Sequence, residues 1–148
     1  MQRTGTIHAL ALLAFTLAAC GLSVDPTTDE LKQRFTAATP GERPHICVQI
    51  AQQQMNEADK LYAANDFDKA QTALTDVVAY SELARDYAIQ SRKHQKQTEI
   101  AVRQLSRRLN DLMRSLPHDD QPAVRDAITR LQRVRDDLLA AMFPKGAK

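Results

Sequence analysis

Few side chains of this 148-residue chain are of the types that perform catalysis or bind metal ions. The cysteines are Cys20 and Cys47, and beyond the first 19 residues the histidines are His45, His94 and His118. The histidines lie far apart in the sequence, and His45 and Cys47 would point in different directions from a helix. A metal site needs ligands that converge. Because the sequence also has no Gly-rich phosphate loop and no HExxH or CxxC motif, we predict no catalysis, no metal site and no cofactor.

Cys20 stands at the end of a short apolar N-terminal segment. Arg3 is the only charged residue before it, and residues 9–19 are apolar or small except for Thr16. This segment of eleven residues is too short to cross a bilayer, which takes about 20 apolar residues. A charged start, a short apolar middle and an exit of small residues are typical of a secretory signal peptide. We therefore predict that residues 1–19 are a signal peptide that is removed.

The exit, Leu17-Ala18-Ala19-Cys20, resembles the lipobox of bacterial lipoproteins. The resemblance implies that Cys20 becomes the new N-terminus and is acylated on its thiol and its amine, as in a palmitate-carrying lipoprotein. Several acyl chains hold a protein on a membrane far more durably than one chain. Gly21, where an Asp would resemble an inner-membrane retention signal, favours the outer membrane facing the periplasm. The alternative is an ordinary signal peptide with an incidental cysteine.

The chain that follows the signal peptide has almost no net charge. Without Arg3, 19 basic and 18 acidic residues remain, so the net charge is +1 and no global electrostatic partner is implied. Cys47 would be the only free thiol, so no internal disulfide is expected. We predict a lipidated tether with a short helix over residues 20–43, one helical domain over 44–143 and a tail over 144–148. In the tether, Thr27 and Glu30 have the spacing of a capping box.

The domain is predicted to be all-α because the residues that interrupt helices, glycine and proline, are nearly absent from it. Glycine is missing between residues 42 and 145, and proline between 45 and 116. Apolar or small residues recur at alternating steps of three and four from Phe67 to Leu116, which predicts one long central helix over about residues 66–116 with a coiled-coil-like seam. Helices over about 44–64 and 123–142 would fold back antiparallel on its two halves. The predicted shape is a pair of elongated helical hairpins.

The first predicted hairpin covers about residues 56–80, and Asn65 is expected to be left-handed between its two helices. Its pattern of apolar residues is Ala58, Leu61, Tyr62, Phe67, Ala70 and Leu74. This pattern resembles a tetratricopeptide repeat. The second helix continues where that repeat would stop, and no second copy follows at a 34-residue spacing. The resemblance therefore implies a local hairpin and carries over no peptide-binding residues.

One stretch of the predicted central helix is strongly basic. Its members are Arg92, Lys93, Lys96, Arg103, Arg107 and Arg108. They could form a solvated face, partly neutralised by Asp126, Asp136 and Asp137 of the last helix. They could also bind an anionic partner, such as lipid headgroups, an acidic envelope polymer or an acidic protein. Nucleic acid is not expected, because the export signal argues against it and the stretch has no aromatic residues for base stacking.

These features predict a protein whose function is contact rather than chemistry. We expect a lipid-anchored adaptor or scaffold of the cell envelope that contacts an envelope protein or a second copy of itself through its helices. The alternative is a periplasmic carrier or binding protein that holds an apolar or anionic ligand between helices. No small-molecule substrate is expected.

Overall fold

The computed structural model describes residues 25–145 of the chain, and within them every regular element is helical. The predicted all-α class is therefore confirmed for this part. The predicted signal peptide, Cys20 and the end of the predicted tail lie outside the described residues. The elements are α1 (Thr28–Ala37), α2 (Arg43–Ala63), α3 (Phe67–Ser91), α4 (Gln95–Ser115), a short 3-10 turn η1 (His118–Asp120) and α5 (Pro122–Met142).

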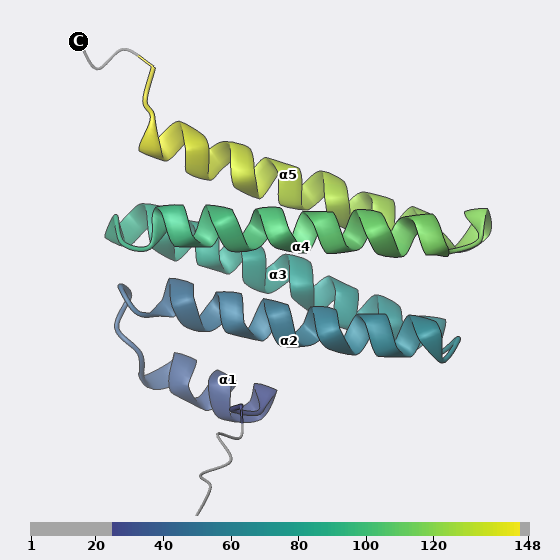
Figure 1. The fold of residues 1–148 in the computed structure, drawn as a ribbon. Helices are drawn as coiled ribbons and strands as arrows, with labels where there is room; N and C mark the ends of the chain where they lie inside the picture. Colours follow the sequence, from purple (N-terminus) through teal and green to yellow (C-terminus); the bar gives the residue numbers. More distant parts are fainter. Residues whose placement is uncertain (1–24, 146–148) are drawn as a thin grey trace, which may run out of the picture.

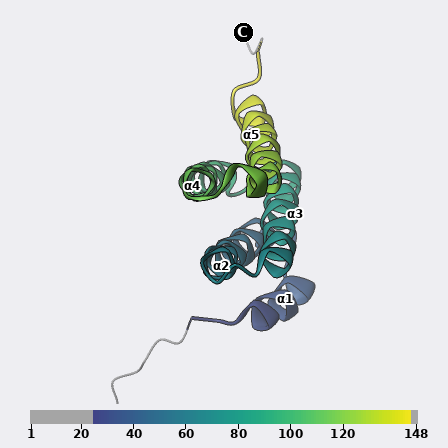
Figure 2. The ribbon, with the colours of Figure 1, turned by 90° about the vertical axis from the view of Figure 1, so that its right-hand side faces the viewer.

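The four longer helices form two antiparallel hairpins, α2 with α3 and α4 with α5, which stack side by side (Figure 1). Seen along the helices, α2 and α4 lie on one side of the stack and α3 and α5 on the other, with α1 beneath (Figure 2). One continuous core joins the hairpins, because Met55 of α2 and Leu105 and Leu109 of α4 are fully buried in the same cluster as Leu131 and Leu138 of α5.

The single central helix predicted over about residues 66–116 is wrong, because the chain reverses at residues 92–94. Arg92 and His94 adopt left-handed backbone conformations, with φ of 55° and 60°. Neither residue is glycine, so each pays a steric cost of about 1 kcal/mol. Packing of α4 against the first hairpin offsets that cost. The apolar pattern continues through the turn because α3 and α4 each bury a stripe of the same spacing. With 25 residues, α3 is about 37 Å long, roughly half the length of one helix over residues 66–116.

The predicted capping box and the predicted left-handed residue of the first hairpin are both found in the structure. The backbone amide of Glu30 donates to Thr27 Oγ1 at 3.3 Å and that of Thr27 donates to Glu30 Oε2 at 2.8 Å, which is the capping box of α1. Asn65, with φ of 58°, is the left-handed residue between α2 and α3. The α2–α3 hairpin therefore exists where it was predicted, while its likeness to a repeat family stays a prediction.

α1 packs along α2. Leu31 is fully buried with Ile46 and Ile50 of α2 in a second, smaller apolar cluster. At the start of α1, the side-chain amide of Gln53 donates to the carbonyl of Pro26, and Thr28 Oγ1 donates to Gln53 Oε1 at 2.8 Å. The chain is thus attached to the first hairpin from residue 26 onward.

Candidate functional site

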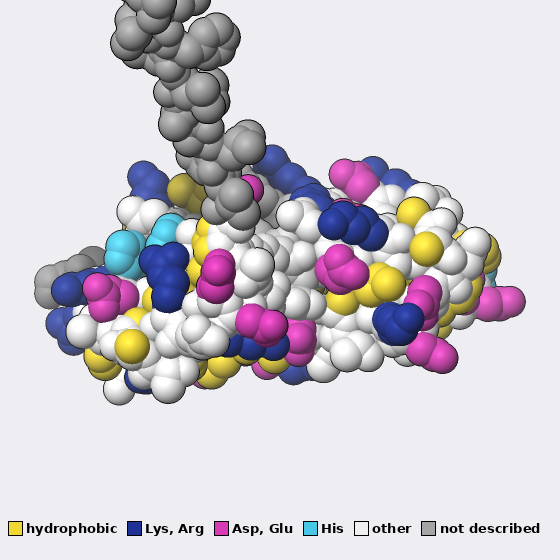
Figure 3. All heavy atoms as spheres, turned by 90° about the horizontal axis from the view of Figure 1, so that it is seen from below, with side chains coloured by type: hydrophobic (Ala, Val, Ile, Leu, Met, Phe, Trp, Pro, Cys, Tyr) yellow, Lys and Arg dark blue, Asp and Glu magenta, His cyan; other side chains and the backbone are white. Residues whose placement is uncertain are grey.

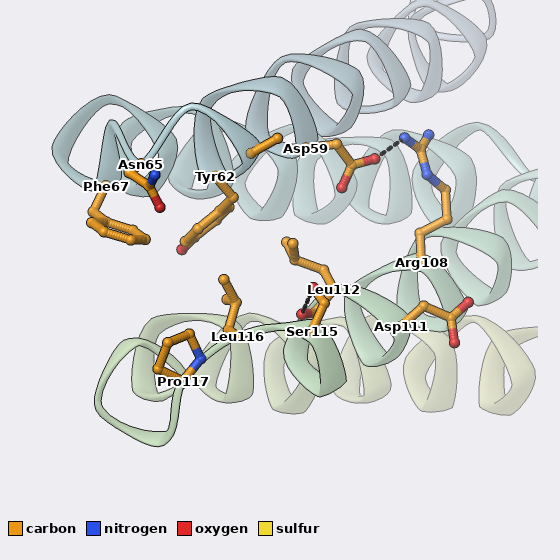
Figure 4. A pocket seen from close by; sticks show the side chains of 11 residues that line it. Asp59, Tyr62, Asn65, Phe67, Arg108, Asp111, Leu112, Ser115, Leu116 and Pro117 are labelled. Atoms are coloured by element: carbon orange, nitrogen blue, oxygen red, sulfur yellow. Dashed lines mark hydrogen bonds and ion pairs between the residues drawn. The ribbon is translucent and has the colours of Figure 1, made fainter.

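A cleft of about 490 Å³ opens at the end of the molecule where α2 and α4 both terminate (Figure 4). One wall is the α2–α3 turn of the first hairpin, and the other is the last turn of α4 and the chain that follows it. Its apolar surface comes from Tyr62, Phe67, Leu112, Leu116 and Pro117. Its volume lies within the range of about 300–1,000 Å³ that small-molecule pockets occupy.

Local backbone geometry explains why two aromatic rings meet in this cleft. Because Asn65 reverses the chain after α2, Phe67 at the start of α3 returns against Tyr62, with ring centroids 6.0 Å apart. Tyr62 is only 4% exposed, yet its hydroxyl has no hydrogen-bond partner among the described residues. Burial raises the pKa of Tyr62, and the negative charge of Asp120 raises it further. The hydroxyl therefore stays protonated and keeps a hydrogen to donate.

Charged side chains form the rim of the cleft. Arg108 of α4 binds Asp59 of α2 across it, as the dashed line in Figure 4 marks. Asp111 accepts from Arg114 Nη1 at 3.2 Å, and both side chains are largely exposed. Ser115 Oγ donates to the carbonyl of Leu112 at 2.7 Å, so this hydroxyl is already used. The lining thus contains two carboxylates, of Asp59 and Asp111, and one guanidinium, of Arg108.

The six basic residues predicted as one face have different neighbours in the structure. Arg108 faces α2 through its ion pair with Asp59, and Arg103 Nη2 lies 3.9 Å from Glu99 Oε2. Arg107 is exposed further along α4. In the part of the chain that the structure describes, no ion pair joins any of the six to Asp126, Asp136 or Asp137. Asp137 instead accepts from Arg85 Nη1 at 3.0 Å.

Arg92, Lys93 and Lys96 lie at the opposite end of the molecule, at and just after the turn between α3 and α4. There the structure brings His45 and His94 together, with ring centroids 6.4 Å apart, although they are far apart in sequence. Figure 3 shows histidine side chains beside Lys and Arg side chains near this end. Within residues 25–145 no group of three or more His, Cys, Asp or Glu side chains is placed to hold a metal ion.

Two other sequence candidates, Cys47 and His118, do not line the cleft. Cys47 is completely buried in α2, and burial raises the pKa of its thiol to about 12. His118 is exposed in η1. Cys20 lies outside the described residues, and among the helices that are described none is long and apolar enough to cross a membrane.

No protein-family profile, curated protein or solved structure matches this chain. The cleft itself was missed by sequence reasoning, because it forms only when the second hairpin stacks on the first. The sequence predicts Tyr62 and Phe67 in the first hairpin, but it places Leu116 at the end of one long helix. The turn at residues 92–94 is what brings Leu112 and Leu116 opposite Tyr62.

Proposed function

We propose that this protein is a lipid-anchored adaptor of the cell envelope that holds a partner protein in the cleft between its two hairpins. The observation that carries the proposal is the cleft, which has an apolar floor, a charged rim and a buried tyrosine hydroxyl without a partner. Binding surfaces between proteins commonly combine an aromatic anchor pocket with a polar rim. Acylated Cys20 would hold the protein on the membrane, most simply on the periplasmic face of the outer membrane.

The role proposed is contact rather than catalysis. Most charged or nucleophilic groups of the cleft already have a partner: Asp59 pairs with Arg108, and the hydroxyl of Ser115 donates to the carbonyl of Leu112. A nucleophile needs an adjacent base to activate it, and the hydroxyl of Ser115 points to a carbonyl instead. This arrangement supports a binding surface.

The cavity volume also favours a second candidate, a carrier that holds a small apolar ligand. A volume of about 490 Å³ is sufficient for one. A carrier usually encloses most of its ligand, with about 70–90% of the ligand surface buried. Here the cleft lies at one end of the stacked hairpins and is lined by the ends of α2 and α4, the residues that follow them and the start of α3. Such a cleft suits a side chain that protrudes from a partner better than a small ligand that must be enclosed.

Site-directed photo-crosslinking in intact cells tests the adaptor proposal. A photoreactive phenylalanine analogue replaces Ala63, which is exposed on the rim of the cleft, and in a matched control it replaces Gln132, which is exposed on α5. We expect one envelope protein to be crosslinked at position 63 and not at position 132, with its identity given by mass spectrometry.

Other outcomes of the crosslinking experiment contradict the adaptor proposal in different ways. Crosslinks only between two copies of this chain would indicate a homodimer in place of a separate partner. If no protein is crosslinked at position 63 and native mass spectrometry of the purified protein reveals a bound small molecule, the carrier candidate replaces the adaptor.

A further inference from the structure

We infer that the cleft at the ends of α2 and α4 binds a short peptide segment of the partner that presents one large apolar side chain next to a Lys or Arg, with the hydroxyl of Tyr62 donating to a backbone carbonyl of that segment. This inference rests on the proposed adaptor function and adds the chemistry by which the partner would be recognised.

The unused hydroxyl of Tyr62 calls for a hydrogen-bond acceptor on the ligand. Tyr62 is 4% exposed and its hydroxyl oxygen is buried without a partner. Buried polar groups are nearly always hydrogen-bonded, so such an exception needs an explanation. A peptide backbone offers a carbonyl oxygen at every residue. In ligand pockets, a small number of placed polar groups fixes the orientation of the ligand.

The apolar surface calls for a large side chain. Tyr62 and Phe67 present adjacent rings from the first hairpin, and Leu112 and Leu116 face them from the second (Figure 4). Apolar groups that fill such a pocket are removed from water, which is the main favourable term in association. The volume of about 490 Å³ exceeds one side chain, so part of the peptide backbone would enter as well.

The charges of the rim call for a basic neighbour. Asp59 and Asp111 outnumber Arg108 in the lining, and Asp120 is close enough to Tyr62 to act on it electrostatically. The ion pair between Asp111 and Arg114 is largely exposed, and such surface pairs are weak. A Lys or Arg of the partner can therefore replace Arg114 on Asp111 with little loss. The aromatic faces also favour a cation close by.

Two capped dipeptides serve as probes of this inference. The full-length protein in a mild detergent is titrated with acetyl-Leu-Lys-amide or with acetyl-Leu-Glu-amide, and binding is followed by nuclear magnetic resonance at the backbone amides of Ala63 and Leu112. We expect both amides to shift with the Lys peptide, and the Glu peptide to bind several-fold more weakly because of the rim carboxylates.

Matched variants test the individual contacts. Tyr62→Phe keeps the ring and removes the hydroxyl, so we expect the Lys peptide to bind about fivefold more weakly, which is what one neutral hydrogen bond contributes. Tyr80→Phe, at a half-buried tyrosine of α3 outside the cleft, should leave binding unchanged. Asp111→Asn, at an exposed position where misfolding is not expected, should reduce the preference for Lys over Glu.

The outcomes separate this inference from the adaptor proposal. Equal binding of the Lys peptide to Tyr62→Phe and to the wild-type protein would overturn the role of the hydroxyl, and equal binding of the two peptides would overturn the basic preference. Absence of shifts at Ala63 and Leu112 with both peptides would overturn the whole inference, even where a partner is still crosslinked at position 63. Loss of that crosslink alone would count against the adaptor instead.

Discussion

Tyr62 and Cys47 lie on the buried side of the same helix, and burial raises the pKa of both. Their positions along α2 give them different chemistry. Cys47 is enclosed near the start of α2, packed away from solvent, whereas Tyr62 lies in the last turn and lines the cleft. A low pKa and access are what make a cysteine reactive, so Cys47 is inert. Under the proposed recognition, the neutral hydroxyl of Tyr62 would donate to a peptide bound in the cleft.

The thiol of Cys47 should therefore resist alkylation by iodoacetamide at about pH 8 in the folded protein and react readily in concentrated guanidinium chloride. Mass spectrometry of tryptic peptides measures the modified fraction. Rapid labelling of Cys47 in the folded protein would mean that α2 opens far more often than its packing indicates.

The same thiol should make stability fall at high pH. The folded thiol keeps its proton up to about pH 12, whereas an unfolded one loses it above its ordinary value of 9.0. Above that value the unfolded state binds fewer protons than the folded state, so the free energy of unfolding decreases as the pH rises. Urea unfolding between about pH 8 and 10 should show a steeper decrease for the wild type than for Cys47→Ala. Parallel pH profiles would contradict the assignment.

At the scale of the elements, most helix ends could be read from the sequence and one could not. Three helix ends have a local signal in the sequence: the capping box of Thr27 and Glu30, the left-handed Asn65, and Pro122 in the first turn of α5. The turn between α3 and α4 contains no glycine or proline, and its local side-chain bond, from the backbone amide of Lys93 to Ser91 Oγ at 3.3 Å, is not a sufficient signal in the sequence. The turn forms together with the stacking of the hairpins. For the same reason the sequence identified Tyr62 and Phe67 but not the cleft that they share with α4.

Arg92→Gly should stabilise the protein, because glycine adopts the left-handed conformation at φ 55° without the steric cost that arginine bears. We expect the free energy of unfolding to rise by about 0.5–1 kcal/mol in urea titrations. Arg107→Gly, in the interior of α4, is the control and should lower it by about 1 kcal/mol. A loss of stability in Arg92→Gly would show that the arginine side chain supports the turn.

The contact between α4 and α5 includes a carboxylate that is nearly buried. Glu99 is 7% exposed, and its Oε1 accepts from Arg135 Nε at 2.7 Å, whereas Arg103 Nη2 is 3.9 Å from its other oxygen. Arg135→Met should lower the free energy of unfolding by about 1–2 kcal/mol, because it leaves a charged acceptor poorly satisfied. Arg103→Met should cost less than about 0.5 kcal/mol. Equal effects in urea titrations would contradict the assignment of the stronger bond to Arg135.

At the scale of the whole molecule, the stacking of two hairpins distributes the predicted basic residues to different places. Arg108 becomes part of the cleft, while Arg92, Lys93 and Lys96 lie at the far end beside His45 and His94. A sequence pattern on one assumed helix could not distinguish these environments, because the fold reverses in the middle of it. The cleft and the basic end are thus separated by the length of α4.

The proposed anchor acts on the molecule as a whole. Cys20→Ala should abolish incorporation of radiolabelled palmitate and move the protein from the membrane fraction to the soluble fraction, because several acyl chains are needed for durable binding. Cys47→Ala serves as the control, since it removes the other thiol and should leave labelling and fractionation unchanged. Membrane association that survives the Cys20→Ala change would contradict the lipoprotein prediction.

The bond between Gln53 and the carbonyl of Pro26 sets how far the body of the protein could travel from such an anchor. Six residue steps separate Cys20 from Pro26, and a fully extended chain of that length spans at most about 20 Å. Because α1 packs along α2, it does not lengthen this connection. An acylated protein would therefore work close to the lipid surface, and its partner would have to be captured at the membrane rather than across the width of the periplasm.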